Sequence, residues 1–468
     1  MFEKITLDEV LSPKSFADAI DKEASTYTWY CESDDNNTSI WANFHGANPN
    51  EELIEINVRD SCFYPDKLGR NYITVRGFHM SQAATQWAAP TAEQIGLIGT
   101  HWSKGWIIEN NVISDSKCVG ITLGKDRETG HNVSTKDRNK GGHVHYNEVI
   151  FRALKIGWSK ENIGSHIVRN NTIYNCEVAG ICGSLGAIFS QITGNHIYNV
   201  QRKQQFFGFE TAGIKIHAPI DMLIKNNRIH DSDKAIWLDW MAQGTRVTAN
   251  LCYNNFLTDL FVEVCHGPYI VDNNIFLSEQ TFWNWSHGAC FTHNLCLGKF
   301  SRVVVKNRST PYHTLHSTDV AGLSDIPGGD DRFYNNIIAG ENGIGVYKGS
   351  RYRNWAGGNV YFKGVKAYEG DINSVELSDF DPKVELVEKD DGLYLHIAFP
   401  PISDEPNTPL VITEMLGETI LAHQAFTNYD GTPLKIDTDY FGKKRDEQNP
   451  TAGPFEHIEK GQLIFKVW

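Results

Sequence analysis

Residues 224–229 read IKNNRI, residues 247–252 read VTANLC and residues 291–296 read FTHNLC. Each stretch places an asparagine between short runs of apolar or β-branched residues. The pattern recurs along the middle of the chain, with its asparagine at Asn111, Asn171, Asn195, Asn227, Asn250, Asn273, Asn294, Asn335 and Asn359. Several steps between these asparagines span roughly 20–25 residues, a period typical of a solenoid repeat.

Short alternating runs flank each asparagine, and long helical heptads are absent, so the pattern predicts strands. The repeat therefore predicts an all-β protein, a right-handed parallel β-helix in which each coil buries its inward residues against its neighbours. Asparagine suits a tight corner because it tolerates left-handed backbone geometry and bonds locally. Stacked asparagines are also expected to bond to one another along the axis.

Three steps in the repeat are longer than the rest: Asn111 to Asn171, Asn195 to Asn227 and Asn294 to Asn335. The extra residues are expected to form loops, and loops on one face of a solenoid usually build its binding surface. The first of these insertions contains GKDRETGHNVSTKDRNKGGHVH. We expect this loop to form the rim of a cleft.

The composition divides the chain into three regions. Residues 1–58 are mixed in character and include the strand-like TSIWANF and ELIEINV. The repeat dominates residues 59–375. Residues 376–468 contain the alternating LYLHIAF, a Pro-rich link FPPISDEPNTP and LVITEMLGETILAHQAF, which we interpret as a helix. We expect this tail to pack along or cap the solenoid, because an open coil end must be covered.

Charge and composition restrict the partners. The 468 residues carry a formal net charge of -14, which argues against a nucleic-acid partner. The start MFEKITLDEV has neither a basic nor an apolar region of a signal peptide, and no run of about 18 apolar residues predicts a membrane span. The nine cysteines are interpreted as reduced, and a cytoplasmic location follows. Self-association into a homo-oligomer is left open.

Metal and cofactor binding are not expected. Four histidines, His101, His131, His143 and His145, lie in or near the first insertion. Their spacing matches no zinc motif, and none of the cysteines forms a CxxC pair. We therefore predict no metal and no cofactor.

Two acidic residues occupy matching positions in consecutive repeats: Asp239 in KAIWLDWMAQG and Glu263 in TDLFVEVCHGP. Aligning AGICGS, AGIKIH, KAIWLD and DLFVE turns Ile236 and Leu260 inward, and strand alternation then turns Asp239 and Glu263 outward. His217 falls in the same column one coil earlier. Because neighbouring strands lie about 4.8 Å apart, the two carboxyl groups are expected about 5 Å apart.

Carboxyl groups at that separation are typical of a retaining glycoside hydrolase. Two nearby carboxylates do not both ionise cheaply, so we expect an ionised Asp239 as nucleophile and a protonated Glu263 as general acid and later base. His217 is expected to donate a hydrogen bond to Asp239. The alternative is an outward ladder of solvated polar side chains, which a β-helix also tolerates.

Aromatic and histidine residues surround this pair in the sequence and are candidates for substrate contact: His217, Trp237, Trp240, His266, Trp285 and His287. Aromatic faces can stack on sugar rings, although a tryptophan is also a packing residue. A third acid, Glu210 in FFGFETAGIKIH, lies in the second insertion. It either reaches the pair or is an ordinary loop glutamate.

Three stretches resemble glycoside hydrolase family 120, the β-xylosidases: TAEQIGLIGTHWSKGWIIENNVISDSKCVGITLGK, KAIWLDWMAQGTRVTANLCYNN and DLFVEVCHGPYIVDNNIFLS. The resemblance runs from about Asp21 to the C-terminus and includes DGTPLKIDTDYFG and NPTAGPFE. It implies a right-handed parallel β-helix with a β-sandwich inserted near the N-terminus. It also implies that Asp239 is the nucleophile, Glu263 the acid/base and Glu210 a further active-site carboxylate.

The resemblance implies a retaining exo-β-1,4-xylosidase that releases xylose from the non-reducing end of xylo-oligosaccharides. Family members carry a longer N-terminal part, so residues 1–58 are expected to be the end of the inserted sandwich. Three alternatives stay open. They are a β-helix hydrolase for another sugar (an arabinosidase or fucosidase), a polysaccharide lyase, and a truncated, inactive homologue. A lyase is disfavoured because the predicted column contains no basic residue.

Overall fold

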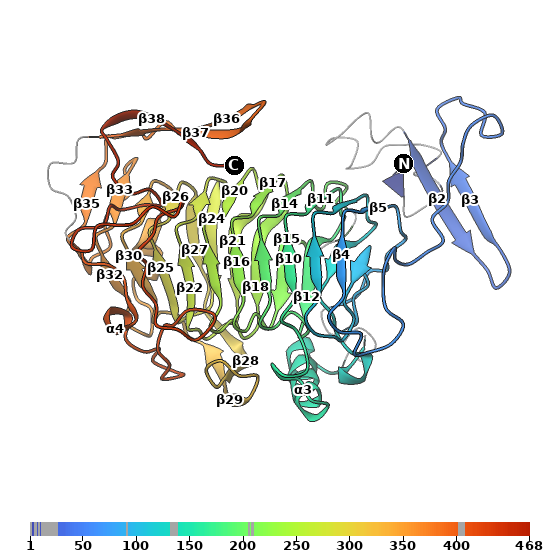
Figure 1. Ribbon diagram of the computed structural model, residues 1–468, viewed down its shortest axis with the longest axis horizontal. Helices are drawn as coiled ribbons and strands as arrows, with labels where there is room; N and C mark the ends of the chain where they lie inside the picture. Colours follow the sequence, from blue (N-terminus) through green and yellow to red (C-terminus); the bar gives the residue numbers. More distant parts are fainter. Residues whose placement is uncertain are drawn as a thin grey trace.

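The computed structural model describes residues 2–3, 7, 10, 27–89, 92–131, 139–204, 206, 210–400 and 408–468. Parts of the first insertion, of FFGFETAG and of the Pro-rich link therefore lie outside the described residues. The protein is a parallel β-helix, in which successive coils each add one strand to long sheets that run the length of the molecule (Figure 1). The predicted solenoid is thus confirmed.

Sheet 1 has eleven parallel strands. In chain order they are β4 (Thr74–Arg76), β7 (Ile107–Glu109), β10 (Ile167–Arg169), β13 (Gln191–Thr193), β16 (Leu223–Lys225), β19 (Arg246–Thr248), β22 (Tyr269–Asp272), β25 (Ala289–Thr292), β30 (Arg332–Tyr334), β32 (Trp355–Gly357) and β34 (Asp371–Ile372).

Sheet 2 also has eleven parallel strands and follows sheet 1 in each coil. They are β5 (His79–Ser81), β8 (Val112–Ser114), β11 (Thr172–Tyr174), β14 (His196–Tyr198), β17 (Arg228–His230), β20 (Leu251–Tyr253), β23 (Ile275–Phe276), β26 (Leu295–Cys296), β31 (Ile337–Ile338), β33 (Val360–Phe362) and β35 (Val375–Leu377).

Sheet 3 has eight strands. They are β6 (Ile98–Gly99), β9 (Val119–Thr122), β12 (Ala179–Ser184), β15 (Ala212–His217), β18 (Lys234–Asp239), β21 (Thr258–Glu263), β24 (Gln280–Trp285) and β27 (Lys299–Arg302). The strands from β12 to β24 have six residues each, whereas most strands of the other sheets have two or three. Sheet 3 is therefore the broadest regular surface of the solenoid.

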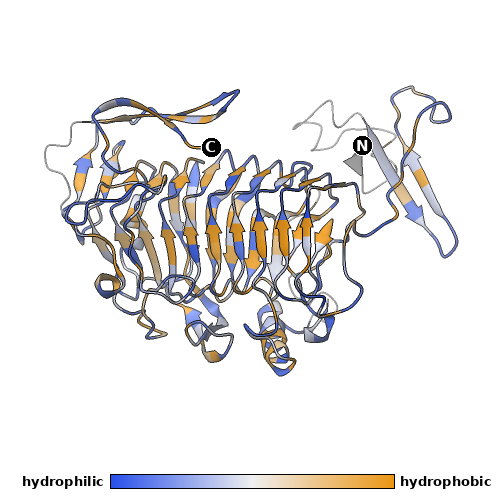
Figure 2. Ribbon diagram, viewed as in Figure 1, coloured by the Kyte–Doolittle hydropathy of each residue, from blue (hydrophilic) through white to orange (hydrophobic). Residues whose placement is uncertain are grey.

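One continuous apolar core fills the solenoid. Ile214, Ile236 and Leu260 point inward from three consecutive coils and are at most 1% exposed, as the alignment of the repeats predicted. Figure 2 shows hydrophobic residues concentrated in the strands and hydrophilic residues in the turns. Burial of these aligned side chains contributes roughly 25 cal/mol per Å² of apolar surface, so the core is the main source of stability.

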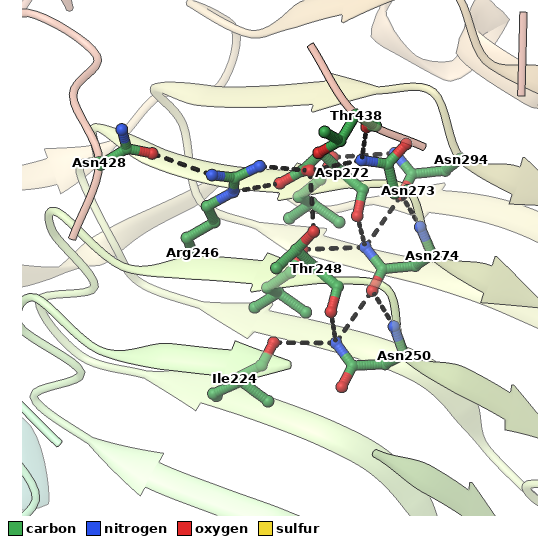
Figure 3. A network of polar contacts seen from close by, with 12 residues as sticks. Ile224, Arg246, Thr248, Asn250, Asp272, Asn273, Asn274, Asn294, Asn428 and Thr438 are labelled. Carbon is green, nitrogen blue, oxygen red and sulfur yellow. Dashed lines mark hydrogen bonds and ion pairs between the residues drawn. The ribbon is translucent and has the colours of Figure 1, made fainter. Parts of the chain in front are cut away.

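A ladder of buried asparagine side chains runs between sheets 1 and 2 (Figure 3). The Asn250 Nδ2 donates to Oδ1 of Asn274 at 2.9 Å, and Asn274 Nδ2 donates to Oδ1 of Asn294 at 3.0 Å. Each rung also accepts a backbone N–H from the preceding rung and donates to a backbone carbonyl. The predicted bonding of stacked asparagines is confirmed, and it satisfies the buried corners of the coils from Asn111 to Asn359.

The ladder corrects two of the predicted positions. It passes through Asn274 and Asn336, not through the predicted Asn273 and Asn335. In each Asn-Asn pair the first residue takes the left-handed conformation, with φ of 55° at Asn273 and 54° at Asn335. The first asparagine therefore makes the corner and the second turns inward to the ladder.

Three insertions interrupt the coils. The first contains the 3-10 helix η3 (Arg127–Thr129) and the helix α3 (Gly142–Lys155), and the third contains the antiparallel hairpin β28 (Val305–His313) and β29 (Val320–Ile326). Helix α3 and the hairpin project from the same edge of the solenoid (Figure 1). A second 3-10 helix, η4 (Gly343–Tyr347), lies near the C-terminal end of the solenoid.

The ends of the chain form two small sheets. At the N-terminus β1 (Phe2–Glu3), β2 (Thr28–Ser33) and β3 (Thr38–Ala42) pair, but the strand-like ELIEINV is irregular, with Leu53 87% exposed. At the C-terminus β36 (Glu385–Lys389), β37 (Gly392–Phe399) and β38 (Gly461–Lys466) lie over one side of the solenoid (Figure 1). In the described residues no helix is long and apolar enough to cross a membrane.

The helix predicted for LVITEMLGETILAHQAF is largely wrong. Only α4 (Thr413–Leu416) is helical, and Gly417, with φ of 66°, ends it. The following residues form short antiparallel bridges, and Val411, Leu416 and Phe426 pack against the outside of sheet 1. Packing on the solenoid overrode the local helical propensity.

Substituting Asn250 with alanine tests the ladder. The change leaves buried N–H and C=O groups of two neighbouring coils without partners, so the free energy of unfolding should fall by about 2–4 kcal/mol. The matched control is Asn226→Gly at the exposed corner residue before Asn227, whose φ of 53° glycine adopts freely. Urea unfolding would contradict the ladder's role if both variants lost the same stability.

Candidate active site

The two predicted carboxylates lie side by side at the ends of adjacent strands. The pairing of sheet 3 sets Asp239 of β18 opposite Glu263 of β21, with His217 one coil before and Trp285 one coil after. Ser184 of β12 precedes His217 in the same column. Each of these five residues is the last residue of its strand. The predicted column is confirmed as a feature of the fold.

A sharp turn follows the first four of the five column positions. Leu185, Ala218, Trp240 and Val264 have φ values of 67°, 57°, 48° and 49°. Residues with a Cβ rarely adopt this left-handed conformation, and a β-branched valine does so least readily. Backbone strain of this kind clusters at functional sites, where the surrounding structure enforces it. The repeated turn holds these four column side chains at the same edge of sheet 3.

The column is buried on its outer face. Asp239 is 4% exposed and Glu263 is 7% exposed, and every residue of β18 and β21 is buried. A ladder of solvated polar side chains would be exposed, so that alternative does not fit. Buried carboxylates need charged or hydrogen-bonding partners.

Lys215 is the main partner of Asp239. It lies two residues before His217 on β15, and its Nζ donates to Oδ2 of Asp239 at 2.7 Å. The Nε2 of His217 lies 2.7 Å from the same oxygen. Two N–H donors on one oxygen favour the ionised carboxylate. The Lys215 Nζ also lies 3.4 Å from the centre of a ring of Trp237, which fixes the indole over the site.

The pKa shifts follow from burial and from these charges. Desolvation raises the pKa of Asp239, and the attraction of the Lys215 ammonium opposes that rise. Desolvation disfavours the charged form of Lys215, but the carboxylates around it, Asp239 first, raise its pKa. Desolvation lowers the pKa of His217 well below its usual range, so its imidazole is neutral. We describe the central pair as an ammonium and a carboxylate, with the His217 proton assigned to Nε2.

The third predicted carboxylate, Glu210, reaches the same cluster. Its side chain is buried, and its Oε1 lies 3.7 Å from Nδ1 of His217 while its Oε2 lies 3.1 Å from Sγ of Cys182. Desolvation raises the pKa of Glu210, opposed by the Lys215 ammonium. Glu210 also has a φ of 76°. It is therefore no ordinary loop glutamate, because it is folded back over the outer face of sheet 3.

Glu263 has a different partner. Its Oε1 accepts a hydrogen bond of 2.6 Å from Nη1 of Arg308, which comes from hairpin β28–β29. On the other side of the column, Tyr146 of helix α3 packs against His217 and Trp240, with ring centres 5.1 and 4.7 Å apart. The three insertions thus converge on the column, each with one polar or aromatic residue.

Four buried polar atoms at the cluster have no hydrogen-bond partner within the described part of the chain. They are Oδ1 of Asp239, Nδ1 of His217, Oε1 of Glu210 and Nε1 of Trp237. Most buried polar groups in proteins are paired. Donors and acceptors gathered in this way are suited to a ligand with several hydroxyl groups.

The other predicted contact residues are placed differently. Trp285 is partly exposed beside Glu263, with its ring 5.2 Å from that of Phe261. Trp240 is buried against Tyr146. His266 and His287 are fully buried and bond to each other at 3.0 Å, and His266 also bonds Thr310 of the hairpin at 2.8 Å. These histidines anchor the hairpin, and their predicted contact with a substrate stays a prediction.

Two of the histidines in or near the first insertion, His101 and His131, contact Glu93, whose backbone N–H donates to Nδ1 of His131 at 3.3 Å. His101 pairs with Glu93 at 3.1 Å, whereas His145 is buried on α3 near Glu148. Among the residues that the structure describes, no group of three or more His, Cys, Asp or Glu side chains could hold a metal ion.

Sequence reasoning missed Lys215, Arg308 and Tyr146. Lys215 was detectable, since strand alternation places it two residues before His217 on the same face. The argument that the site lacks a basic residue is therefore wrong. Lys215 nevertheless does not fit the neutral base of a lyase, because the surrounding carboxylates raise its pKa and keep it protonated.

Comparison with known proteins places this chain in a family. The model of the glycoside hydrolase 120 insertion domain matches residues 1–56. A solved structure of XylC in complex with xylose is 43% identical, with a TM-score of 0.94 over 100% of this chain and 79% of that one. The chain belongs to glycoside hydrolase family 120. Pectate lyase Pel9A is 9% identical over 85% of this chain and 86% of its own, and its TM-score of 0.36 supports no comparison. No curated protein sequence matches significantly.

Lys215→Met tests the ion pair of this glycoside hydrolase. The substitution leaves Asp239 buried without its cation, so the free energy of unfolding at neutral pH should fall by about 3–5 kcal/mol. The double variant Lys215→Met/Asp239→Asn removes both charges and should recover most of the loss. Urea unfolding measures both variants. A double variant no more stable than Lys215→Met would contradict the assignment of the pair.

Proposed function

We propose that this chain is a retaining exo-β-1,4-xylosidase that releases xylose from the non-reducing end of xylo-oligosaccharides by double displacement. The main support for this proposal is that Asp239 and Glu263 are buried side by side on adjacent strands and that Lys215 bonds Asp239. The 43% identity to XylC, which was solved with xylose, supports xylose as the sugar. The alternatives of an arabinosidase or fucosidase have no observation of their own in their favour.

Asp239 acts as the nucleophile in the first half of the proposed reaction. Its carboxylate attacks the anomeric carbon while Glu263 gives its proton to the glycosidic oxygen, and the leaving sugar departs with that proton. Lys215 and His217 both bond Oδ2, so Oδ1 is the oxygen without a partner among the described residues. We infer that Oδ1 forms the bond to carbon.

Water completes the reaction in the second half. Glu263, now ionised, takes a proton from water as the oxygen attacks the anomeric carbon, and Asp239 leaves as a carboxylate. Lys215 stabilises that leaving carboxylate. Glu210 is suited to a protonated role, because burial raises its pKa, and a protonated carboxyl can donate a hydrogen bond to a sugar hydroxyl. A cytoplasmic location and self-association stay predictions.

The stereochemistry of the product tests the mechanism. Two inversions at the anomeric carbon give net retention, so proton NMR should detect β-xylose before any α-xylose when p-nitrophenyl β-xyloside is hydrolysed. Asp239→Asn should lose at least about a thousandfold of this activity, the size expected for loss of a nucleophile. First-formed α-xylose would overturn the retaining mechanism, and an active Asp239→Asn would overturn the nucleophile.

Azide rescue separates Glu263 from Glu210. In Glu263→Ala the second step lacks its base, and azide, which needs no base, should restore turnover of an aryl xyloside with a good leaving group and yield a β-xylosyl azide. The matched variant Glu210→Ala should gain nothing from azide. Rescue of Glu210→Ala in place of Glu263→Ala would assign the acid/base role to Glu210.

A further inference from the structure

Arg308 is the only residue of hairpin β28–β29 bonded to a predicted catalytic carboxylate among the described residues. Its side chain is 35% exposed, whereas that of Glu263 is 9% exposed. A guanidinium has five N–H donors, and one of them, on Nη1, makes the bond to Glu263. Within the described residues this guanidinium makes no other hydrogen bond or ion pair, so the remaining donors are able to bind a second acceptor.

Hydrogen bonds to helix α3 and to the coils of the solenoid hold the backbone next to Arg308. The carbonyl of Ser309 accepts a hydrogen bond from Nδ2 of Asn147 on α3 at 2.9 Å. The hydroxyl of Thr310 bonds His266 at 2.8 Å and donates to the carbonyl of Val264 at 3.0 Å. Because the two residues after Arg308 are anchored, any movement of the guanidinium is a change of side-chain rotamer.

The bond between Arg308 and Glu263 suits only one half of the proposed reaction. A guanidinium has no acceptor, so it favours the ionised carboxylate, which is the form that takes a proton from water. The general-acid step needs a protonated Glu263. The other charged groups that face Glu263 are Asp239, Glu210, Lys215 and Lys234. Of the cations, only Arg308 is bonded to it directly.

The leaving sugar provides the second acceptor. Glu263 protonates the glycosidic oxygen, and the leaving sugar is bonded to that oxygen. Any side chain that touches the Glu263 carboxylate therefore borders the space of the leaving sugar. Arg308 enters this space from the hairpin, on the solvent side of the column.

We infer that Arg308 changes partner during turnover: it pairs with Glu263 in the free enzyme and donates to hydroxyl groups of the leaving sugar when a xylo-oligosaccharide binds. This inference rests on the proposed function. When the substrate displaces the guanidinium, Glu263 takes up a proton from solvent and gives it to the glycosidic oxygen. The carbon–oxygen bond to the leaving sugar breaks as the Asp239 ester forms.

Departure of the leaving sugar frees Arg308 to return to the Glu263 carboxylate. Water then attacks the anomeric carbon, its proton passes to Glu263 and the Asp239 ester breaks. Arg308 is therefore a leaving-group-binding residue that also stabilises the ionised base. Substrates whose leaving group is not a sugar should not need it.

The test compares two substrates in Arg308→Met. The leaving group of xylobiose is a sugar, and its departure needs a general acid. The leaving group of 2,4-dinitrophenyl β-xyloside is not a sugar, and it departs without a general acid. The inference predicts that kcat/KM for xylobiose falls at least about tenfold, chiefly through KM, as expected for loss of a charge-assisted hydrogen bond. For the dinitrophenyl substrate kcat/KM should change less than about threefold. The matched control is Lys306→Met, which removes an exposed cation from the same strand and should leave both substrates unaffected.

Each other outcome is decisive. Equal losses of kcat/KM on both substrates would mean that Arg308 only positions Glu263. Improved hydrolysis of xylobiose would mean that Arg308 only opposes the protonation of Glu263. Either result overturns the inference and leaves the proposed function standing. A folded wild-type chain that hydrolyses neither substrate would refute the proposed function, and the inference with it.

Discussion

In-register parallel pairing of consecutive coils is the constraint on which the site depends. Every strand of sheet 3 that carries a column residue ends at that residue, and after the first four of the five the next residue takes the left-handed conformation. A shift of β21 by one residue against β18 would turn Glu263 into the apolar core and Val264 outward. The asparagine ladder opposes such a shift because its rungs bond only when the coils are aligned. The ladder therefore helps to hold two carboxylates together although it lies between sheets 1 and 2 and they lie at the edge of sheet 3.

The alignment of the coils brings several buried carboxylates together, and two cations, Lys215 and Arg308, offset their repulsion. Asp239, Glu210 and Glu263 are all buried at one edge of sheet 3, where like charges repel and desolvation disfavours ionisation. Lys215 lies among them, and Arg308 covers the outermost. Lys215 is bonded to Asp239 and Arg308 to Glu263, so the proposed nucleophile and the proposed acid/base occupy different electrostatic environments although they are neighbours in register. That difference is what a double-displacement mechanism needs from two chemically similar groups.

The solenoid and the column were predictable because both depend on period. An asparagine every 20–25 residues, roughly, identifies the coils, and strand alternation then places Asp239 and Glu263 on one face. The choice between Asn273 and Asn274 was not predictable from the repeat, because either residue of an Asn-Asn pair fits the corner pattern. Lys215 could have been predicted from the same alternation. Arg308 and Tyr146 could not, since they lie in insertions whose path over the solenoid is set by tertiary contacts such as Thr310 with His266.

The insertions also explain how one edge of a regular solenoid becomes a specific site. Helix α3 and hairpin β28–β29 both leave the coil between sheet 3 and sheet 1, at the turn that follows the column positions. A turn tolerates added residues because no ladder of strand pairing is interrupted there. The strands and the ladder are therefore free to fix Asp239, Glu263 and Lys215, while the insertions supply Tyr146 and Arg308 around them. The coils therefore place the residues proposed to break the glycosidic bond, and the insertions place the residue proposed to bind the leaving sugar.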